Sequence, residues 1–250
     1  MALRRLGIGA LLIGILIGGA SVASAHLKDY LVNQDYYTAK RGEFDVAVWN
    51  DMNFTEADND DSYNSRHQLE VEYGICDHLQ LAYYEIYAWN RAEDWERDAF
   101  KIEAKVRLAQ AGQWPVDVAL YTEYKNPDGH RDIHSDELEN KVILSRDFGP
   151  VNLVGNFIFE RQINAHEDWQ FEYTAGVSYG LTPRVRLGLE LQQSLGNDED
   201  FRFRRARELV LVPGIYASLT PHVRVLAGPA FGLTRQSDDF ALKSIVEVEF

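Results

Sequence analysis

Apolar and polar residues alternate along almost the whole chain after residue 42. In the stretch 98–109, one set of positions carries Phe100, Ile102, Ala104, Val106 and Leu108, and the other carries Lys101, Glu103, Lys105 and Arg107. Successive side chains of a β-strand point to opposite faces, so a period of two predicts strands with one apolar and one polar face. Twelve such strands are predicted, at 42–54, 65–74, 78–90, 98–109, 115–126, 136–146, 151–161, 168–180, 184–195, 207–218, 222–234 and 240–250. The fold class is therefore all-β.

The connections between these strands alternate in length. Five are tight turns, near residues 76, 112, 148, 182 and 220, and six are longer polar loops, near residues 60, 94, 131, 165, 201 and 236. Each strand is long enough to cross a membrane at a tilt, which takes about 9 to 11 residues. The pattern predicts a twelve-stranded antiparallel transmembrane β-barrel with short periplasmic turns and longer extracellular loops.

The apolar face of each strand is expected to contact lipid. A charged side chain that faces lipid at the bilayer midplane costs about 2–4 kcal/mol, so the charged face must line the inside of the barrel. The alternative is a soluble barrel, in which the charged face would be outside. Glu85 departs from the pattern because it shares its face with Leu81 and Tyr83. Either a bulge shifts the phase there or the assignment of that strand is wrong.

The first residues have the features of a secretory signal peptide. Arg4 and Arg5 precede an apolar run at 6–20, and the small residues at 23–25 suit a cleavage site. The domain organisation expected is a signal peptide at 1–25, a periplasmic lead-in or small plug at 26–41, and the barrel at 42–250. The chain carries a net charge of −14, which makes nucleic acid an improbable partner.

The last strand carries apolar residues at alternate positions up to the terminus, at Val246, Val248 and Phe250. This ending resembles the C-terminal signal of bacterial outer-membrane β-barrels, which the barrel-assembly machinery reads during insertion. The resemblance implies an outer-membrane location with both termini in the periplasm. It also implies contact with outer-membrane lipid and lipopolysaccharide.

The sequence around the first tight turn, from Tyr73 to Leu81, reads Tyr-Gly-Ile-Cys-Asp-His-Leu-Gln-Leu. It is similar to a loose group of uncharacterised twelve-stranded barrels, some described as transporters or as meta-pathway phenol-degradation proteins. The resemblance implies the architecture of a transport barrel and leaves the solute open.

The polar faces predict a charged, net acidic lumen. The residues expected to line it are Glu70, Glu72, Lys101, Glu103, Lys105, Arg107, Asp117, Glu123, Glu137, Glu139, Arg184, Arg186, Glu190 and Arg224. Such a lining holds water and favours cations, which predicts a channel or transporter-like barrel for a small solute. The alternative is a structural barrel that does not conduct because its charges pair and fill it. A hairpin centred on residue 112 would place Arg107 opposite Asp117 and Lys101 opposite Glu123.

Two groups of residues could support catalysis or metal binding. Ser65 and His67 share the lipid-facing side of one strand, and Asn50 on the preceding strand could lie diagonally beside His67. These residue types resemble the Ser, His and Asn of outer-membrane phospholipase A. The main expectation is a channel that is not an enzyme, and a lipid hydrolase that uses these three residues is the second alternative. The segment 128–136 contains two histidines and three aspartates that could bind zinc or copper. Histidines in a polar loop are usually only solvated, so no metal and no cofactor is expected.

Overall fold

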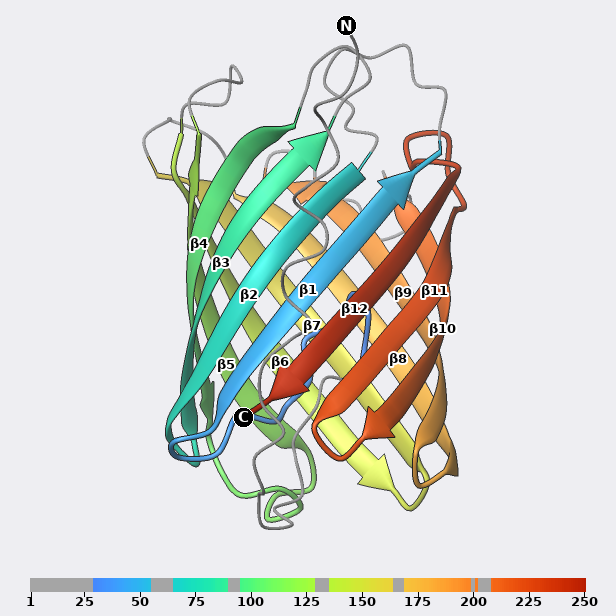
Figure 1. The fold of residues 1–250 in the computed structure, drawn as a ribbon. Coiled ribbons are helices and arrows are strands. Elements are labelled where there is room, and N and C mark those ends of the chain that lie inside the picture. Colours follow the sequence, from blue (N-terminus) through green and yellow to red (C-terminus); the bar gives the residue numbers. More distant parts are fainter. Residues whose placement is uncertain are drawn as a thin grey trace, which may run out of the picture.

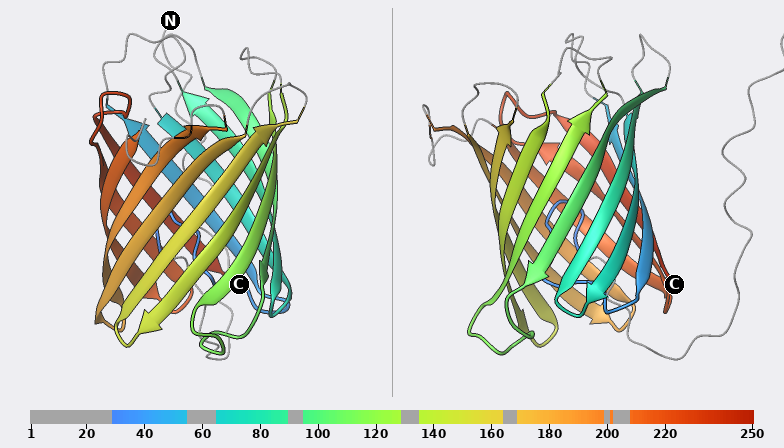
Figure 2. Two further views of the ribbon diagram at one scale, coloured as in Figure 1. Left: turned by 180° about the vertical axis from the view of Figure 1, so that it is seen from behind. Right: turned by 90° about the vertical axis from the view of Figure 1, so that its left-hand side faces the viewer.

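Twelve antiparallel strands close into one barrel (Figures 1 and 2). The structure is a computed structural model, and it describes residues 29–54, 65–89, 95–128, 135–163, 169–198, 201 and 208–250. The strands are β1 (Phe44–Asn53), β2 (Ser65–Cys76), β3 (Leu79–Trp89), β4 (Glu96–Arg107), β5 (Asp117–Pro127), β6 (Glu137–Phe148), β7 (Val151–Gln162), β8 (Gln170–Thr182), β9 (Val185–Asn197), β10 (Leu209–Thr220), β11 (Val223–Gly232) and β12 (Phe240–Glu249). Both the fold class and the twelve strands predicted from the alternation are confirmed. No described segment forms a helix that is long and apolar enough to cross a membrane.

Each strand pairs with the next, and β12 pairs with β1 to close the sheet. We call the end of the barrel where β2 is joined to β3 the turn end, and the opposite end the loop end; the turn end is at the bottom of Figure 1. The apolar residues of the last strand, Val246, Val248 and Phe250, lie at the closing seam. Val248 is opposite Val46, and the Phe250 N–H donates to the Phe44 carbonyl oxygen at 2.9 Å. Closure pairs both edges of the sheet formed by the twelve described strands, and a bilayer requires such a sheet without free edges.

Burial alternates along the strands as the sequence pattern predicts. Ile102 is 51% exposed and its neighbour Glu103 is 1% exposed, and Ile215 is 55% exposed beside a fully buried Tyr216. Apolar side chains therefore cover the outside of the barrel, and charged and polar ones point inward. Aromatic side chains gather near both rims, with Phe44 against Phe250 at the turn end and Phe240 against Phe54 and Phe231 at the loop end.

Glu85 lies on the outer face, as the unshifted phase of β3 requires. The bulge in the pairing of β3 with β4 falls between Ile86 and Tyr87, beyond this residue. The Glu85 carboxylate forms an ion pair with Arg97, and it accepts a hydrogen bond from the Tyr83 hydroxyl. Local pairing on the outer face, with no change of phase, therefore explains the one acidic residue that breaks the alternation of β3.

The register expected for β4 and β5 is wrong by two residues. The pairs are Arg107 with Ala119 and Lys101 with Lys125. The reason is the connection, which runs from 108 to 116 and is longer than a tight turn. Asp117 caps this connection by accepting a hydrogen bond from the Gly112 N–H at 2.7 Å. A shift of two leaves every side chain on its expected face.

A test of the outward face compares two positions on β10. Ile215 lies at the middle of the strand and Leu219 near the turn end, and both are exposed. We expect Ile215→Arg to lower the free energy of unfolding in lipid vesicles by about 2–4 kcal/mol and Leu219→Arg by about 0–1 kcal/mol, because the cost falls toward the interface. Equal losses in urea titrations of the two variants would contradict a membrane centred on Ile215.

Candidate functional site

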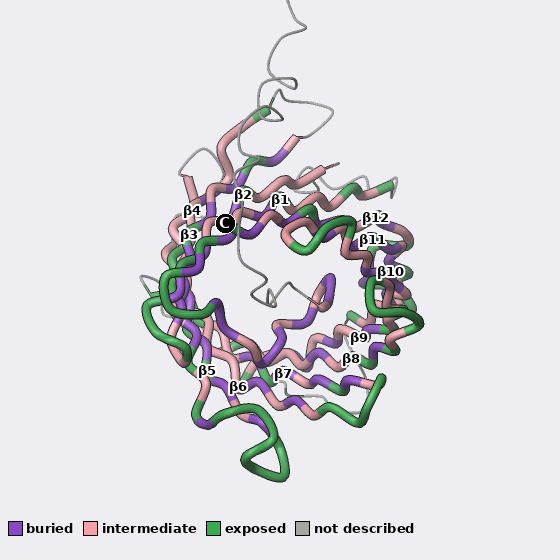
Figure 3. Tube along the Cα trace, turned by 60° about the horizontal axis from the view of Figure 1, so that its bottom comes forward, coloured by how far each residue is buried: buried purple, intermediate pink, exposed green. Residues whose placement is uncertain are grey.

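The segment 29–41 lies inside the barrel. Figure 3 shows it as a buried stretch of the tube that crosses the space enclosed by the strands. Tyr30 and Tyr36 are 1% exposed and Leu31 is 3% exposed. These side chains belong to the main cluster of buried apolar residues, together with Tyr121, Tyr216 and others on the inner wall. The segment is therefore part of the packed interior.

Glu190 on β9 holds this segment by its backbone. Its carboxylate accepts hydrogen bonds from three consecutive backbone N–H groups, those of Leu31 at 2.7 Å, Val32 at 2.9 Å and Asn33 at 2.9 Å. The Asn33 side-chain amide and the Tyr216 hydroxyl also donate to it, at 2.9 and 2.7 Å. A buried carboxylate is costly without such donors, so the segment and Glu190 stabilise each other.

Inner side chains of β7 and β8 hold the same segment from a second side. Asn156 accepts from the Gln34 N–H at 2.7 Å and donates to the Gln34 carbonyl oxygen at 2.9 Å. The Tyr30 hydroxyl donates to Asn152 Oδ1 at 2.5 Å. Burial raises the pKa of the Tyr30 phenol, so it remains a donor at neutral pH. Gly176 leaves room for the Tyr30 ring, because a Cβ at this position would lie 2.8 Å from it.

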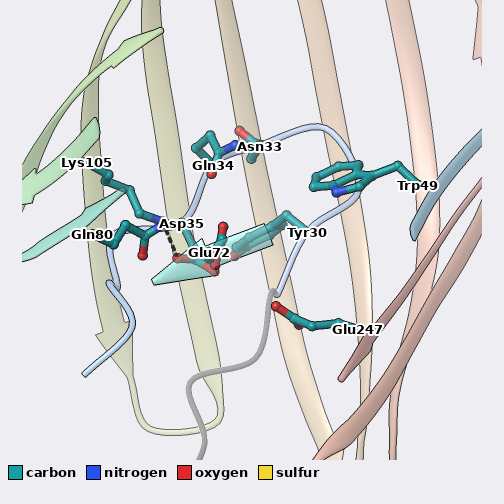
Figure 4. A pocket seen from close by; sticks show the side chains of 9 residues that line it. All are labelled: Tyr30, Asn33, Gln34, Asp35, Trp49, Glu72, Gln80, Lys105 and Glu247. Atoms are coloured by element: carbon teal, nitrogen blue, oxygen red, sulfur yellow. Dashed lines mark ion pairs between the residues drawn. The ribbon is translucent and has the colours of Figure 1, made fainter. Parts of the chain in front are cut away.

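The opposite wall, on β2–β4, holds the part of the segment nearer the turn end. Figure 4 shows Lys105 and Asp35 facing each other, with Lys105 Nζ 3.6 Å from Asp35 Oδ1. Gln80 Oε1 accepts from the Ala39 N–H at 2.9 Å. The cavity that remains among these groups has a volume of about 10 Å³, which is close to the room that one water molecule needs. The segment therefore nearly fills this part of the interior.

A larger chamber lies toward the loop end. It has a volume of about 380 Å³, and the side chains of Leu31 and Val32 border it. Six acidic and five basic side chains line it: Asp51, Glu123, Glu137, Glu139, Glu160 and Glu172, with Arg66, Lys101, Lys125, Lys141 and Lys243. The formal charge of the lining is −1, the difference between these two sets. The chamber is thus strongly polar and close to neutral.

The charges of the inner wall form rows across the strands. Glu103, Glu123, Glu139 and Glu160 are successive Cα partners on β4, β5, β6 and β7. Directly opposed like charges destabilise a sheet, and lysines on neighbouring rows offset this. Nζ–Oε distances are 2.8 Å for Lys101 and Glu123, 2.7 Å for Lys125 and Glu137, and 2.9 Å for Lys141 and Glu139. The first of these ion pairs joins diagonal neighbours on adjacent strands, the second joins direct Cα partners, and the third joins two residues of one strand.

Of the other residues expected to line the lumen, all but Arg184 lie inside the barrel. Most are buried inside the barrel away from the chamber, namely Glu70, Glu72, Glu103, Lys105, Asp117, Glu190 and Arg224. Arg186 donates to Ser178 Oγ at 2.8 Å, and the Arg107 guanidinium lies 5.7 Å from the centre of the Tyr36 ring. Arg184 does not line the lumen, because β8 ends at Thr182 and β9 begins at Val185, which leaves Arg184 exposed in the turn.

Sequence reasoning left open whether the segment before the first strand lies inside the barrel. Tyr30, Asn33 and Tyr36 precede the first strand and show no period of two, so no pattern assigned them to the interior. One available signal was glycine at the inward position 176, where the strand pattern expects a polar side chain. Glu190 was identified as lumen-lining, but its five donors come from elsewhere in the chain.

A separate polar group lies on the outer face near the loop end. His67 is the Cα partner of Asn50. His67 Nδ1 is 2.7 Å from Asn50 Oδ1, and His67 Nε2 is 3.2 Å from Ser65 Oγ. The three residues considered from the sequence for a lipid hydrolase are therefore in mutual hydrogen-bond contact.

The candidate metal ligands of the segment 128–136 are only partly described. His130, Asp132 and His134 lie outside the described residues. Within the part of the chain that the structure describes, no group of three or more His, Cys, Asp or Glu side chains has a metal-binding arrangement.

Comparisons with known proteins give structural relatives only. No protein-family model and no curated protein matches the sequence. The COG4313 outer membrane channel from Pseudomonas putida F1 superposes with a TM-score of 0.64 at 12% identity, covering 88% of this chain and all of that one. The KdgM porin gives 0.60 at 7% identity, over 82% and 99%, and the NanC porin gives 0.54 at 14% identity, over 83% and 98%. The chain therefore has the twelve-stranded antiparallel barrel fold of bacterial outer-membrane porins and channels.

Proposed function

We propose that the protein is a low-conductance outer-membrane channel for small polar or ionic solutes. The observation that carries the proposal is the chamber of about 380 Å³, which eleven charged side chains line inside an apolar-coated barrel. Charged walls hold water and offer ions exchangeable partners, as a conducting path requires. The long loops face the cell exterior and both termini lie in the periplasm, which is the usual orientation of such barrels.

The inner segment closes this channel on the side of the turn end. Leu31 and Val32 border the chamber, and beyond them the remaining cavity has room for about one water molecule. Conduction therefore requires the segment 29–41 to move. The charged rows and the bordering segment together favour small solutes with separated positive and negative groups.

A structural barrel that does not conduct is the second candidate. The filled interior beside Lys105 and Asp35 favours it, because a permanently held segment would block ions. The two candidates agree on the fold and differ in whether the segment can leave.

Planar-bilayer recordings separate the two candidates. The full chain, refolded and purified, is expected to give small, brief openings, and a variant lacking residues 29–40 is expected to give steady, larger currents. Retained heat-modifiable gel mobility serves as the control for a folded barrel. Silence of both proteins in the presence of a folded barrel would reject the channel and favour the structural barrel.

A further inference from the structure

We propose that Ser65, His67 and Asn50 form a catalytic triad that hydrolyses fatty-acyl esters of lipids beside the loop end of the barrel. This activity is separate from the channel, because the triad is on the outer face and the chamber is inside.

The geometry assigns one role to each residue. Ser65 Oγ is 3.2 Å from His67 Nε2, which places the hydroxyl within reach of a general base. Asn50 Oδ1 is 2.7 Å from His67 Nδ1 and, as an amide oxygen, accepts a hydrogen bond from the N–H at that nitrogen. A protonated Nδ1 leaves the Nε2 lone pair free to accept the serine proton.

A fourth residue orients Asn50. The Asn50 side-chain amide donates to Ser244 Oγ on β12 at 3.3 Å, which turns its oxygen toward His67. Strand pairing fixes these positions, since Asn50 is directly opposite Ser244 on one side and His67 on the other. The third group of the triad is thus held by backbone register on three adjacent strands.

The surroundings of the triad are apolar. Val48, Leu69 and Met52 are 40%, 43% and 42% exposed on the same outer face. The centre of the Trp95 ring lies 4.8 Å from the centre of the His67 ring. Polar and ionisable groups among lipid-facing side chains are costly and usually mark function. The backbone pairing of β1 with β2 does not depend on the three side chains of the triad.

The reaction that this geometry supports is acyl transfer to water. Ser65 Oγ attacks the ester carbonyl carbon as His67 Nε2 takes the hydroxyl proton. The tetrahedral intermediate collapses, and the leaving alkoxide takes that proton, so an alcohol departs and an acyl–Ser65 ester remains. A water molecule then attacks the acyl carbon while His67 takes its proton, and collapse returns this proton to Ser65 Oγ and releases the fatty acid.

The location selects the substrate class. An outward hydroxyl between apolar side chains and the loop-end aromatic residues meets the acyl-ester region of lipids rather than soluble esters. Phospholipids and lipopolysaccharide both carry fatty-acyl esters. Assays in two kinds of vesicle, one without and one with lipopolysaccharide, distinguish these two substrates.

The test measures fatty-acid release by the purified full-length barrel in two kinds of vesicle. One contains phosphatidylethanolamine with phosphatidylglycerol, and the other adds lipopolysaccharide with labelled acyl chains. We expect release in at least one arm, and we expect Ser65→Ala and His67→Ala each to reduce it by about 1,000-fold or more. Thr122→Ala is the matched control, because it removes an exposed lipid-facing hydroxyl on β5 and should leave release unchanged.

Asn50 is a positioning residue, and its test separates orientation from folding. Asn50→Ala should lower kcat about 100-fold with little change in KM, and Asn50→Asp should recover most of the loss because it keeps an oxygen facing Nδ1. A long-chain sulfonyl fluoride should label Ser65 in the unsubstituted protein, as read by peptide mass spectrometry.

Two results would overturn the proposal. One is the absence of fatty-acid release and of Ser65 labelling in a barrel that is folded by heat-modifiable mobility. The other is hydrolysis that persists in Ser65→Ala. Bilayer conductance should be the same in Ser65→Ala and the unsubstituted protein, so failure of this proposal leaves the channel untouched.

Discussion

Glu190→Ala should convert the barrel into a steadily conducting one. The substitution removes the acceptor of five hydrogen bonds, three of them from the backbone of Leu31, Val32 and Asn33. Each buried donor left without an acceptor costs about 1–3 kcal/mol, and about 1.4 kcal/mol changes a population tenfold. We therefore expect the fraction of time spent open in planar bilayers to rise at least about tenfold.

Two further variants make this prediction specific. Glu190→Gln keeps one acceptor oxygen and should give an intermediate open fraction. Glu172→Ala removes an inner carboxylate that accepts a hydrogen bond from Gln192 on β9 at 3.0 Å, and it should leave the inner segment in place. An open fraction in Glu190→Ala that equals that of the unsubstituted protein, while the variant lacking residues 29–40 conducts, would show that Glu190 does not hold the closed state.

Replacing both Glu160 and Glu172 with lysine should reverse the ion preference of the channel. Both side chains line the chamber. Each substitution replaces a charge of −1 with a charge of +1, so the two together change the formal charge of the lining from −1 to +3. Recordings in the Glu190→Ala background should show a cation preference before the change and an anion preference after it. The difference should increase as salt is lowered, because the Debye length grows from about 8 Å at 0.15 M to about 30 Å at 0.01 M.

A charge-conserving exchange is the control for this reversal. Lys125 and Glu137 form an ion pair with an Nζ–Oε2 distance of 2.7 Å at the chamber wall. Lys125→Glu combined with Glu137→Lys keeps the formal charge of the lining and should keep the cation preference. Reversal potentials that stay unchanged in the Glu160 and Glu172 double variant would place the selective part of the path outside this chamber.

Residue types and the two-residue period of a strand predicted part of the triad. The two-residue spacing of Ser65 and His67 already places both on one face of a strand. The sequence alone left Asn50 as a diagonal neighbour, whereas the register of β1 with β2 places it directly opposite His67. A shift of two residues in register keeps Asn50 on the outer face and decides whether its side chain contacts the His67 ring.

The sequence by itself determined the number of strands, their approximate limits and which face of each strand points outward. These properties follow from a local period of two and from the cost of charge in lipid, so they need no knowledge of distant contacts. The tertiary structure decided the register of β4 with β5, the row of glutamates that begins at Glu103, and the course of the segment 29–41. Register depends on the length of a connection, and the donors to Glu190 from the segment 29–41 lie 157 to 159 residues away in the chain. Closure of the barrel brings such distant groups together, and no local pattern in the sequence contains that information.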